Sequence, residues 1–254
     1  GDNDAPKDEE SAEIWMSLGI PKDRIFFFGK KDNWWGPAGV TGPCGPDTEM
    51  HYDLTQKPHG EDCKPGCSCG RFSEVWNDVF MQYNKKSDGT FEKLPKPNVD
   101  TGMGLERILS VVNGFDDDYQ TDLWKEAIEK ISQITKKSYK ENIKAFRIIA
   151  DHVRASTFVI ADGVVPSNKE QGYILRRLIR RTVLQLNRMG VAEYEPAIRT
   201  ISEIFIGLMS NQYSELNDNK ELILKTFSDE IKKFVVTLNK GLKKKKKIEN
   251  IDGK

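Results

Sequence analysis

The sequence has no long hydrophobic run among its 254 residues. No apolar segment approaches the roughly 20 residues that a membrane-spanning helix needs. The opening residues, GDNDAPKDEESAE, are polar and acidic, whereas a signal peptide begins with a basic region and continues with an apolar one. These absences argue against a membrane protein and against export, and they predict a cytoplasmic location.

Cysteine is scarce, and neither sign of charge dominates. Three of the four cysteines lie in CKPGCSC, a spacing typical of a metal clip or of reactive thiols rather than of a secreted disulfide framework. The formal net charge is zero, but 31% of the residues are charged, and lysine and arginine are unevenly distributed. The neutral balance therefore does not exclude contact with nucleic acid.

Internal repeats are absent, and KKKKK at 243–247 is the one low-complexity stretch. About the first 100 residues hold most of the glycine, proline, tryptophan and cysteine, and they predict a helix near 9–18 followed by strands and loops. FSEVWNDVFMQYN favours a strand. The Asp-Gly of KKSDGT after it is typical of a tight turn, so this strand and FEKLPKP are expected to form an antiparallel hairpin.

From Gly104 onward the pattern changes to helical periods, near 104–113, 120–136, 141–161, 170–189, 193–210 and 219–246. With 37% hydrophobic residues, the chain can bury a core. We therefore expect an α+β protein with a sheet-bearing domain at 1–115 and an all-helical domain at 116–254.

The stretch VDTGMGLERI, at 99–108, places two glycines just before a Glu-Arg pair at the expected start of a helix. Gly102 and Gly104 allow a ligand to approach the backbone closely, and the free N–H groups of a helix start form an anion site. Arg107 would project from the first turn, where a guanidinium binds two phosphate oxygens at once. The pattern favours a nucleotide polyphosphate, and the alternative is a strand-to-helix turn with a surface arginine.

The segment HGEDCKPGCSC supplies four candidate ligands for a structural Zn²⁺ ion: His59, Cys63, Cys67 and Cys69. The proline and glycine between the cysteines allow the loop to fold back on itself. The alternative is a cysteine-rich surface loop that stays reduced, with His59 a bystander. Cys44, in GPCGP, is expected to pack rather than to bind metal.

The segment GYILRRLIRRTVLQLNR predicts an amphipathic helix with two faces. Leucine and isoleucine form one face, at Leu175, Leu178, Ile179 and Leu186, and arginine forms most of the other, at Arg176, Arg177, Arg180, Arg181 and Arg188. Acidic residues at i+4 spacing are absent from 176–188, so these arginines are expected to lack partners and to contact nucleic-acid phosphates. The alternative is a salt-bridged helix face.

Several segments together carry a family resemblance. VDTGMGLERI resembles motif 3 of the class II aminoacyl-tRNA synthetases. Five segments resemble the alanyl-tRNA synthetase family: DNWWGPAGVTGPCGPDTE, EVWNDVFMQYN, LPKPNVDTGMGLER, IADHVRASTFVIADGVVPSNKEQGYILRRLIRR and TLNKGL. These segments occur in the family's order from about residue 1 to 242. The resemblance implies the antiparallel-sheet half of a class II catalytic domain followed by a helical tRNA-recognition domain, with ATP, alanine and tRNA(Ala) as substrates.

The resemblance assigns roles to the residues around motif 3. Arg107 matches the arginine that contacts the γ-phosphate of ATP, and Gly102 and Gly104 match the flat floor under the adenylate. Asp100 matches the carboxylate that holds the α-amino group of alanine, and a buried ammonium needs such a charged acceptor.

The same resemblance implies an alanine pocket and a magnesium site. Asn77 and Val79 match alanine-pocket positions, and Trp35 matches the aromatic wall that keeps the pocket small, although Val79 and Trp35 are equally compatible with a core. Glu49 and Glu74 would hold Mg²⁺ at the ATP phosphates, because hard cations take carboxylate ligands.

In this family the helical domain reads a G·U wobble pair in the tRNA acceptor stem. Asn168, in VVPSNKEQGY, matches the asparagine that hydrogen-bonds this pair, and its amide carries both donors and acceptors. By this resemblance Arg176, Arg177, Arg180 and Arg181 would bind the tRNA.

Motif 1, and motif 2 with its ATP α-phosphate arginine, do not occur in the sequence. We therefore expect a fragment or one part of a split enzyme, inactive alone and completed by a second chain that carries both motifs. The family's second G·U-reading residue, an aspartate, and its editing domain are expected beyond TLNKGL. Two alternatives are a non-catalytic module that binds the tRNA acceptor stem and a protein-interaction piece held by the cysteine loop.

Overall fold

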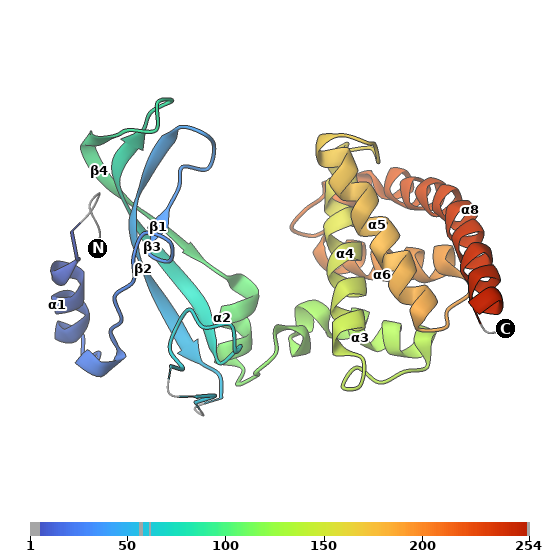
Figure 1. The fold of residues 1–254 in the computed structure, drawn as a ribbon, viewed down its shortest axis with the longest axis horizontal. Coiled ribbons are helices and arrows are strands. Elements are labelled where there is room, and N and C mark those ends of the chain that lie inside the picture. Colours follow the sequence, from blue (N-terminus) through green and yellow to red (C-terminus); the bar gives the residue numbers. More distant parts are fainter. Residues whose placement is uncertain (1–5, 56–57, 61, 253–254) are drawn as a thin grey trace. The chain divides into compact units, whose positions relative to one another are not determined.

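The computed structural model describes residues 6–55, 58–60 and 62–252 (Figure 1). Its internal contacts divide the chain into two compact units, Gly1–Thr121 and Asp122–Lys254. The first carries the sheet and the second is helical, so the α+β prediction is confirmed. Among the described residues, none of the helices combines the length and the apolar character needed to span a bilayer.

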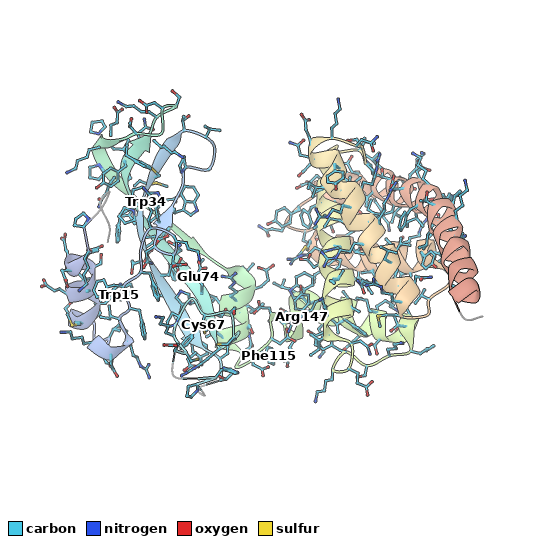
Figure 2. All side chains as sticks on the ribbon, viewed as in Figure 1. Trp15, Trp34, Cys67, Glu74, Phe115 and Arg147 are labelled. Atoms are coloured by element: carbon cyan, nitrogen blue, oxygen red, sulfur yellow. The ribbon has the colours of Figure 1, made fainter. Side chains whose placement is uncertain are left out.

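The first unit is built around a four-stranded antiparallel sheet in the order β1-β2-β3-β4. Its elements in chain order are α1 (Glu9–Ser17), η1 (Lys22–Arg24), β1 (Trp34–Trp35), β2 (Gly42–Asp53), β3 (Phe72–Lys85), β4 (Phe91–Met103), α2 (Leu105–Val112) and η2 (Asp118–Gln120). Helix α1 contacts the sheet through Trp15, whose Nε1 donates to Thr48 Oγ1 at 3.0 Å (Figure 2).

The β3–β4 hairpin closes at the predicted Asp-Gly turn. Lys86 N donates to Thr90 O at 2.9 Å, and Gly89 N donates to Lys86 O at 3.0 Å. Gly89 has a φ of +87°, which glycine adopts without the steric cost of a side chain. The predicted hairpin is confirmed, although β4 continues to Met103 and so carries Asp100 and Gly102 on a strand.

The second unit is a bundle of helices: α3 (Asp122–Thr135), α4 (Ile143–Ala161), α5 (Glu170–Arg188), α6 (Tyr194–Met209), α7 (Glu215–Asp218) and α8 (Lys220–Asp252). The predicted ranges agree with these bounds to within two residues, except that α8 continues six residues beyond its predicted end and that the sequence did not predict α7. Helix α5 packs against α4 and α8. The core consists of fully buried large side chains, among them Phe146, Ile149, Leu175, Ile179, Leu186, Ile198, Phe205 and Ile223.

Candidate active site and nucleic-acid interface

The register of the sheet places six residues side by side in two rows on one face. One row runs Asp47, Val79, Asp100 and the other Glu49, Asn77, Gly102, across β2, β3 and β4. Residues two apart on a strand face the same side of a sheet. Five of these six were assigned from the sequence, and the structure brings those five together.

Asp47 and His51 belong to the same face and were missed from the sequence. Asn77 Nδ2 donates to Asp47 Oδ2 at 3.3 Å and to Glu49 Oε1 at 3.2 Å, and Asn33 Nδ2 donates to Asp47 Oδ1 at 3.3 Å. His51 Nε2 lies 2.8 Å from Glu49 Oε2. The alternation of ionisable residues at 47, 49, 51 and 53 in DTEMHYD was the available signal, because it is the period of a strand.

This carboxylate cluster is suited to a cation. Burial raises the pKa of Asp47, the amides of Asn77 and Asn33 oppose that rise, and the carboxylates of Glu49 and Glu74 add to it. A nearby positive charge stabilises the ionised form of a carboxylate in such surroundings. Among the described residues, Asn77 Oδ1 is buried without a hydrogen-bond partner. The donor set fits Mg²⁺ or an ammonium group.

A β-bulge brings Glu74 to the start of helix α2. Met50 pairs with Trp76 and His51 pairs with Glu74, so Val75 is the extra residue on β3. The Val75 carbonyl accepts from Gly104 N at 3.1 Å, which fixes the start of α2. The bulge also puts Glu74, labelled in Figure 2, on the face that carries Asn77.

Arg107 reaches back from α2 to the end of β3. Its Nη1 donates to Glu74 O at 2.7 Å and lies 3.5 Å from Glu74 Oε2. A Cβ atom at Gly104 would lie 3.1 Å from Arg107 Cδ, so glycine at this position leaves room for the arginine to fold over the helix start. A Cβ at Gly102 would meet nothing within 4 Å, so the backbone there is open to a ligand.

Exposure separates the remaining site residues. Val79 is buried at 6% exposure, whereas Asp100 and Gly102 are exposed. Trp35 is 40% exposed and pairs with Gly45. Its role as the alanine-pocket wall stays a prediction.

A cleft of about 960 Å³ lies beside β2. Asp47, Glu49 and His51 line it, together with aromatic side chains that include Trp15, Phe28 and Trp34. Trp34, rather than Trp35, is the tryptophan of the pair that lines this cleft, and it packs against Tyr83 with ring centroids 5.6 Å apart. The cleft combines acidic groups with apolar walls, as small-molecule sites do.

The cysteine loop between β2 and β3 gathers its predicted ligands (Figure 2, Cys67). The ligand atoms of His59, Cys63 and Cys69 lie within 4.8 Å of one another. Cys63 Sγ is 3.9 Å from Cys69 Sγ, close to the separation of two sulfurs bound about 2.3 Å from one tetrahedral Zn²⁺. Cys67 Sγ is 2.8 Å from Cys69 Sγ, so these two must move apart to bind one ion.

Arg71 ties this loop to β2. Its Nε donates to Asp53 Oδ1 at 2.9 Å, and its Nη1 donates to Cys63 Sγ at 3.6 Å. A backbone hydrogen bond at His59, together with Arg71, lowers the pKa of Cys63. The hydrogen bond between Cys67 and Cys69 lowers the pKa of Cys67 and raises the pKa of Cys69. A lowered pKa increases the fraction of each thiol present as thiolate, which is the form that binds metal.

In the helical unit, Asn168 is exposed on the loop before α5. Ser167 N donates to Gly172 O at 3.0 Å, which closes this loop on the first turn of the helix. A Cβ atom at Gly172 would lie 2.5 Å from Val165 O and 2.3 Å from Ser167 Oγ, so the close approach requires glycine.

The prediction that the arginines of α5 lack acidic partners was wrong for two of them. Glu230 of α8 lies 2.7 Å from Arg180 Nε and 3.7 Å from Arg176 Nε. This partner is distant in the sequence, so i+4 spacing could not reveal it. Arg177 and Arg181 are exposed, and neither forms an ion pair within the part of the chain that the structure describes.

The sequence profile of the family described as tRNA synthetases, class II (A), matches residues 3–252. The chain belongs to this family. The alanine–tRNA ligase of Treponema denticola is 47% identical over 229 residues, which cover 88% of this chain and 38% of that protein. The ligase of Borrelia hermsii is 44% identical over 248 residues (95% and 41%), and that of Treponema pallidum is 42% identical over 247 residues (95% and 40%).

The class II synthetase profile covers both units, so the sheet and the helical bundle belong to one family architecture. The chain spans about two fifths of the length of these relatives. The assignment of individual substrate-binding residues stays a prediction.

Proposed function

We propose that the chain is the part of an alanine–tRNA ligase that activates alanine with ATP and positions the acceptor stem of tRNA(Ala). The observation that carries this proposal is the single sheet face on which Asp47, Glu49, Asn77, Asp100 and Gly102 lie together. The similarity to three alanine–tRNA ligases supports it. Such a ligase would work in the cytoplasm.

In this proposal the face holds alanine and ATP side by side. Asp100 accepts the α-amino group of alanine, and the open backbone at Gly102 lies under the adenylate. Arg107 binds the γ-phosphate, for which it must exchange its contact with Glu74 for phosphate oxygens. The alanine carboxylate attacks the α-phosphorus, the bond to pyrophosphate breaks, and the tRNA ribose hydroxyl later displaces AMP.

Mg²⁺ would be held by Glu49 and Glu74, with Asp47 beside them, and would neutralise phosphate charge. We expect the α-phosphate arginine of motif 2 to lie outside these 254 residues. The proposal therefore requires that motifs 1 and 2 come from elsewhere in the protein or from a second chain, and it expects these residues alone to be inactive.

A structural Zn²⁺ in the cysteine loop is a second part of the proposal. Three ligand atoms within 4.8 Å of one another, and a fourth thiol beside them, match the donor count of such a site. The loop also contributes Cys63 and Arg71 to the lining of the cleft, so a bound ion would hold one wall of the cleft in place.

The enzyme reading is tested by calorimetric titration of a non-hydrolysable alanyl-adenylate analogue into the chain. We expect saturable binding that Asp100→Asn weakens about tenfold or more, because the ammonium loses its charged acceptor. Lys93→Ala, an exposed change on the same strand, is the matched control and should leave binding unchanged. A chain that binds acceptor-stem RNA and shows no saturable binding of the analogue favours the non-catalytic alternative, a tRNA-binding module.

A further inference from the structure

Glu230 is a buried acid in the helical unit, with 3% of its surface exposed. Burial of an unpaired carboxylate is strongly unfavourable. Its Oε1 accepts from Arg180 Nε at 2.7 Å and lies 3.7 Å from Arg176 Nε. The two guanidinium groups of α5 therefore balance a charge that comes from α8.

Arg176 extends this pairing to the surface. Its Nη1 donates to Oδ1 of Asn168. A guanidinium has only donors, so the amide oxygen must be the atom that faces Arg176. The Nδ2 group of Asn168 forms no hydrogen bond within the described part of the chain, and the residue is exposed.

The backbone under Asn168 is fixed separately from its side chain. Ser167 N donates to Gly172 O at 3.0 Å, Lys169 N donates to Ser167 Oγ at 3.2 Å, and Ser167 Oγ donates to Lys169 O at 2.9 Å. The loop thus sets the position of Asn168, and Arg176 sets the orientation of its amide.

We propose that Glu230 and Arg176 are positioning residues that fix Asn168 as a hydrogen-bond donor toward an acceptor atom on a base edge of RNA. This inference rests on the proposed function, in which the helical unit reads the acceptor stem. Asn168 then presents its two N–H groups to the RNA, because its oxygen is turned toward Arg176. Glu230 keeps Arg176 from turning to the RNA phosphates, so the pair contributes discrimination rather than affinity.

The test compares two acceptor-stem hairpin RNAs that differ only in one pair, G·U or G·C, by filter binding to the full chain. The readout is the ratio of the two dissociation constants, together with each constant. Glu230→Gln keeps the shape and removes the charge. We expect it to reduce the G·U preference about tenfold while the affinity for the G·C hairpin stays equal or rises, because the freed Arg176 binds phosphate.

Asn168→Asp tests the polarity of the contact without disturbing the core, because the residue is exposed. An aspartate offers only acceptors. We expect the G·U preference to be lost, whatever the effect of the new charge on both affinities. Asp229→Asn, a change at a half-exposed residue of α8 beside Glu230, is the matched control and should keep the preference.

A G·U preference that persists in Asn168→Asp would overturn the donor assignment, and one that persists in folded Glu230→Gln would overturn the positioning role. Equal loss of affinity for both hairpins in Glu230→Gln would also overturn it, since that is the result of structural damage. If the unmodified chain binds both hairpins equally, this unit does not read a G·U pair. That result would contradict the proposed function rather than the positioning role.

Discussion

At the scale of single residues, burial and local hydrogen bonds set Cys44 apart from Cys63 and Cys67. Cys44 is fully buried, and burial raises the pKa of its thiol. Cys63 and Cys67 lie in the loop between β2 and β3, where hydrogen bonds lower their pKa values. Since the thiolate is the reactive form, Cys44 and these two loop thiols should differ in reactivity at neutral pH.

We expect iodoacetamide at pH 7 to alkylate Cys63 and Cys67 about tenfold or more faster than Cys44, because a lowered pKa leaves more thiolate at that pH. Peptide mass spectrometry over time measures the three rates. Zinc should protect the loop thiols and leave the Cys44 rate unchanged, and Cys63→Ser should release the bound zinc. Equal rates at Cys44 and Cys63, or purified protein free of zinc in the absence of chelator, would remove the metal site from the proposal.

At the scale of elements, the start of α5 depends on one glycine. The Cβ atom of an alanine at 172 would lie 2.5 Å from the Val165 carbonyl oxygen, which belongs to the backbone. The 165–169 loop would therefore have to move, and it carries Asn168. Gly207, in α6, has nothing within 4 Å of the corresponding position.

We expect Gly172→Ala to lower the free energy of unfolding by about 1–3 kcal/mol through overpacking and to abolish the preference for G·U hairpins. Gly207→Ala should raise the free energy of unfolding by about 0.5–1 kcal/mol, because alanine favours a helix over glycine. Urea titration of both variants measures the change. A neutral or stabilising Gly172→Ala would show that the loop does not depend on this close approach.

The exposed arginines of α5 should act on affinity alone. Replacing Arg177 and Arg181 with alanine should weaken binding to all acceptor-stem RNAs alike and lower the salt dependence by about one to two units of slope, because phosphate contacts release counterions. Asn168→Ala should leave the slope alone and cost about 1–3 kcal/mol of G·U preference. Lys225→Ala, a basic residue of α8 paired with Asp229, is the control for lost charge. An unchanged slope in the double variant would place the RNA elsewhere.

The elements that the sequence predicted best are those fixed by local pattern. The helical ranges follow from the spacing of apolar residues, and the Asp88-Gly89 hairpin follows from its turn residues. Both signals can be read from a few neighbouring residues. Strand β2 was not recognised as one strand, because GPCGPD reads as a turn when considered alone. The pairing of Glu230 with Arg176 and Arg180 crosses from α8 to α5, and the bulge at Val75 depends on the pairing of β2 with β3. Both depend on tertiary contacts.

At the scale of the whole molecule, the two units carry separate parts of one proposed activity. The sheet unit holds the candidate site for alanine and ATP, and the helical unit holds the candidate RNA surface. The resemblance supplied residue roles on both units that composition and spacing alone left open, and Asp47 and His51 emerged only when the register aligned β2 with β3.

The most direct measurement of the proposed ligase activity is alanine-dependent exchange of pyrophosphate into ATP by a chimera. In it, this chain replaces the matching region of the Treponema denticola ligase, which is 47% identical over 229 residues. We expect exchange that Arg107→Ala lowers about 100-fold or more, as loss of a charge-stabilising donor does in other enzymes. A folded chimera that binds acceptor-stem RNA but exchanges no pyrophosphate, while the unaltered relative does, would contradict the assignment of catalysis to these residues.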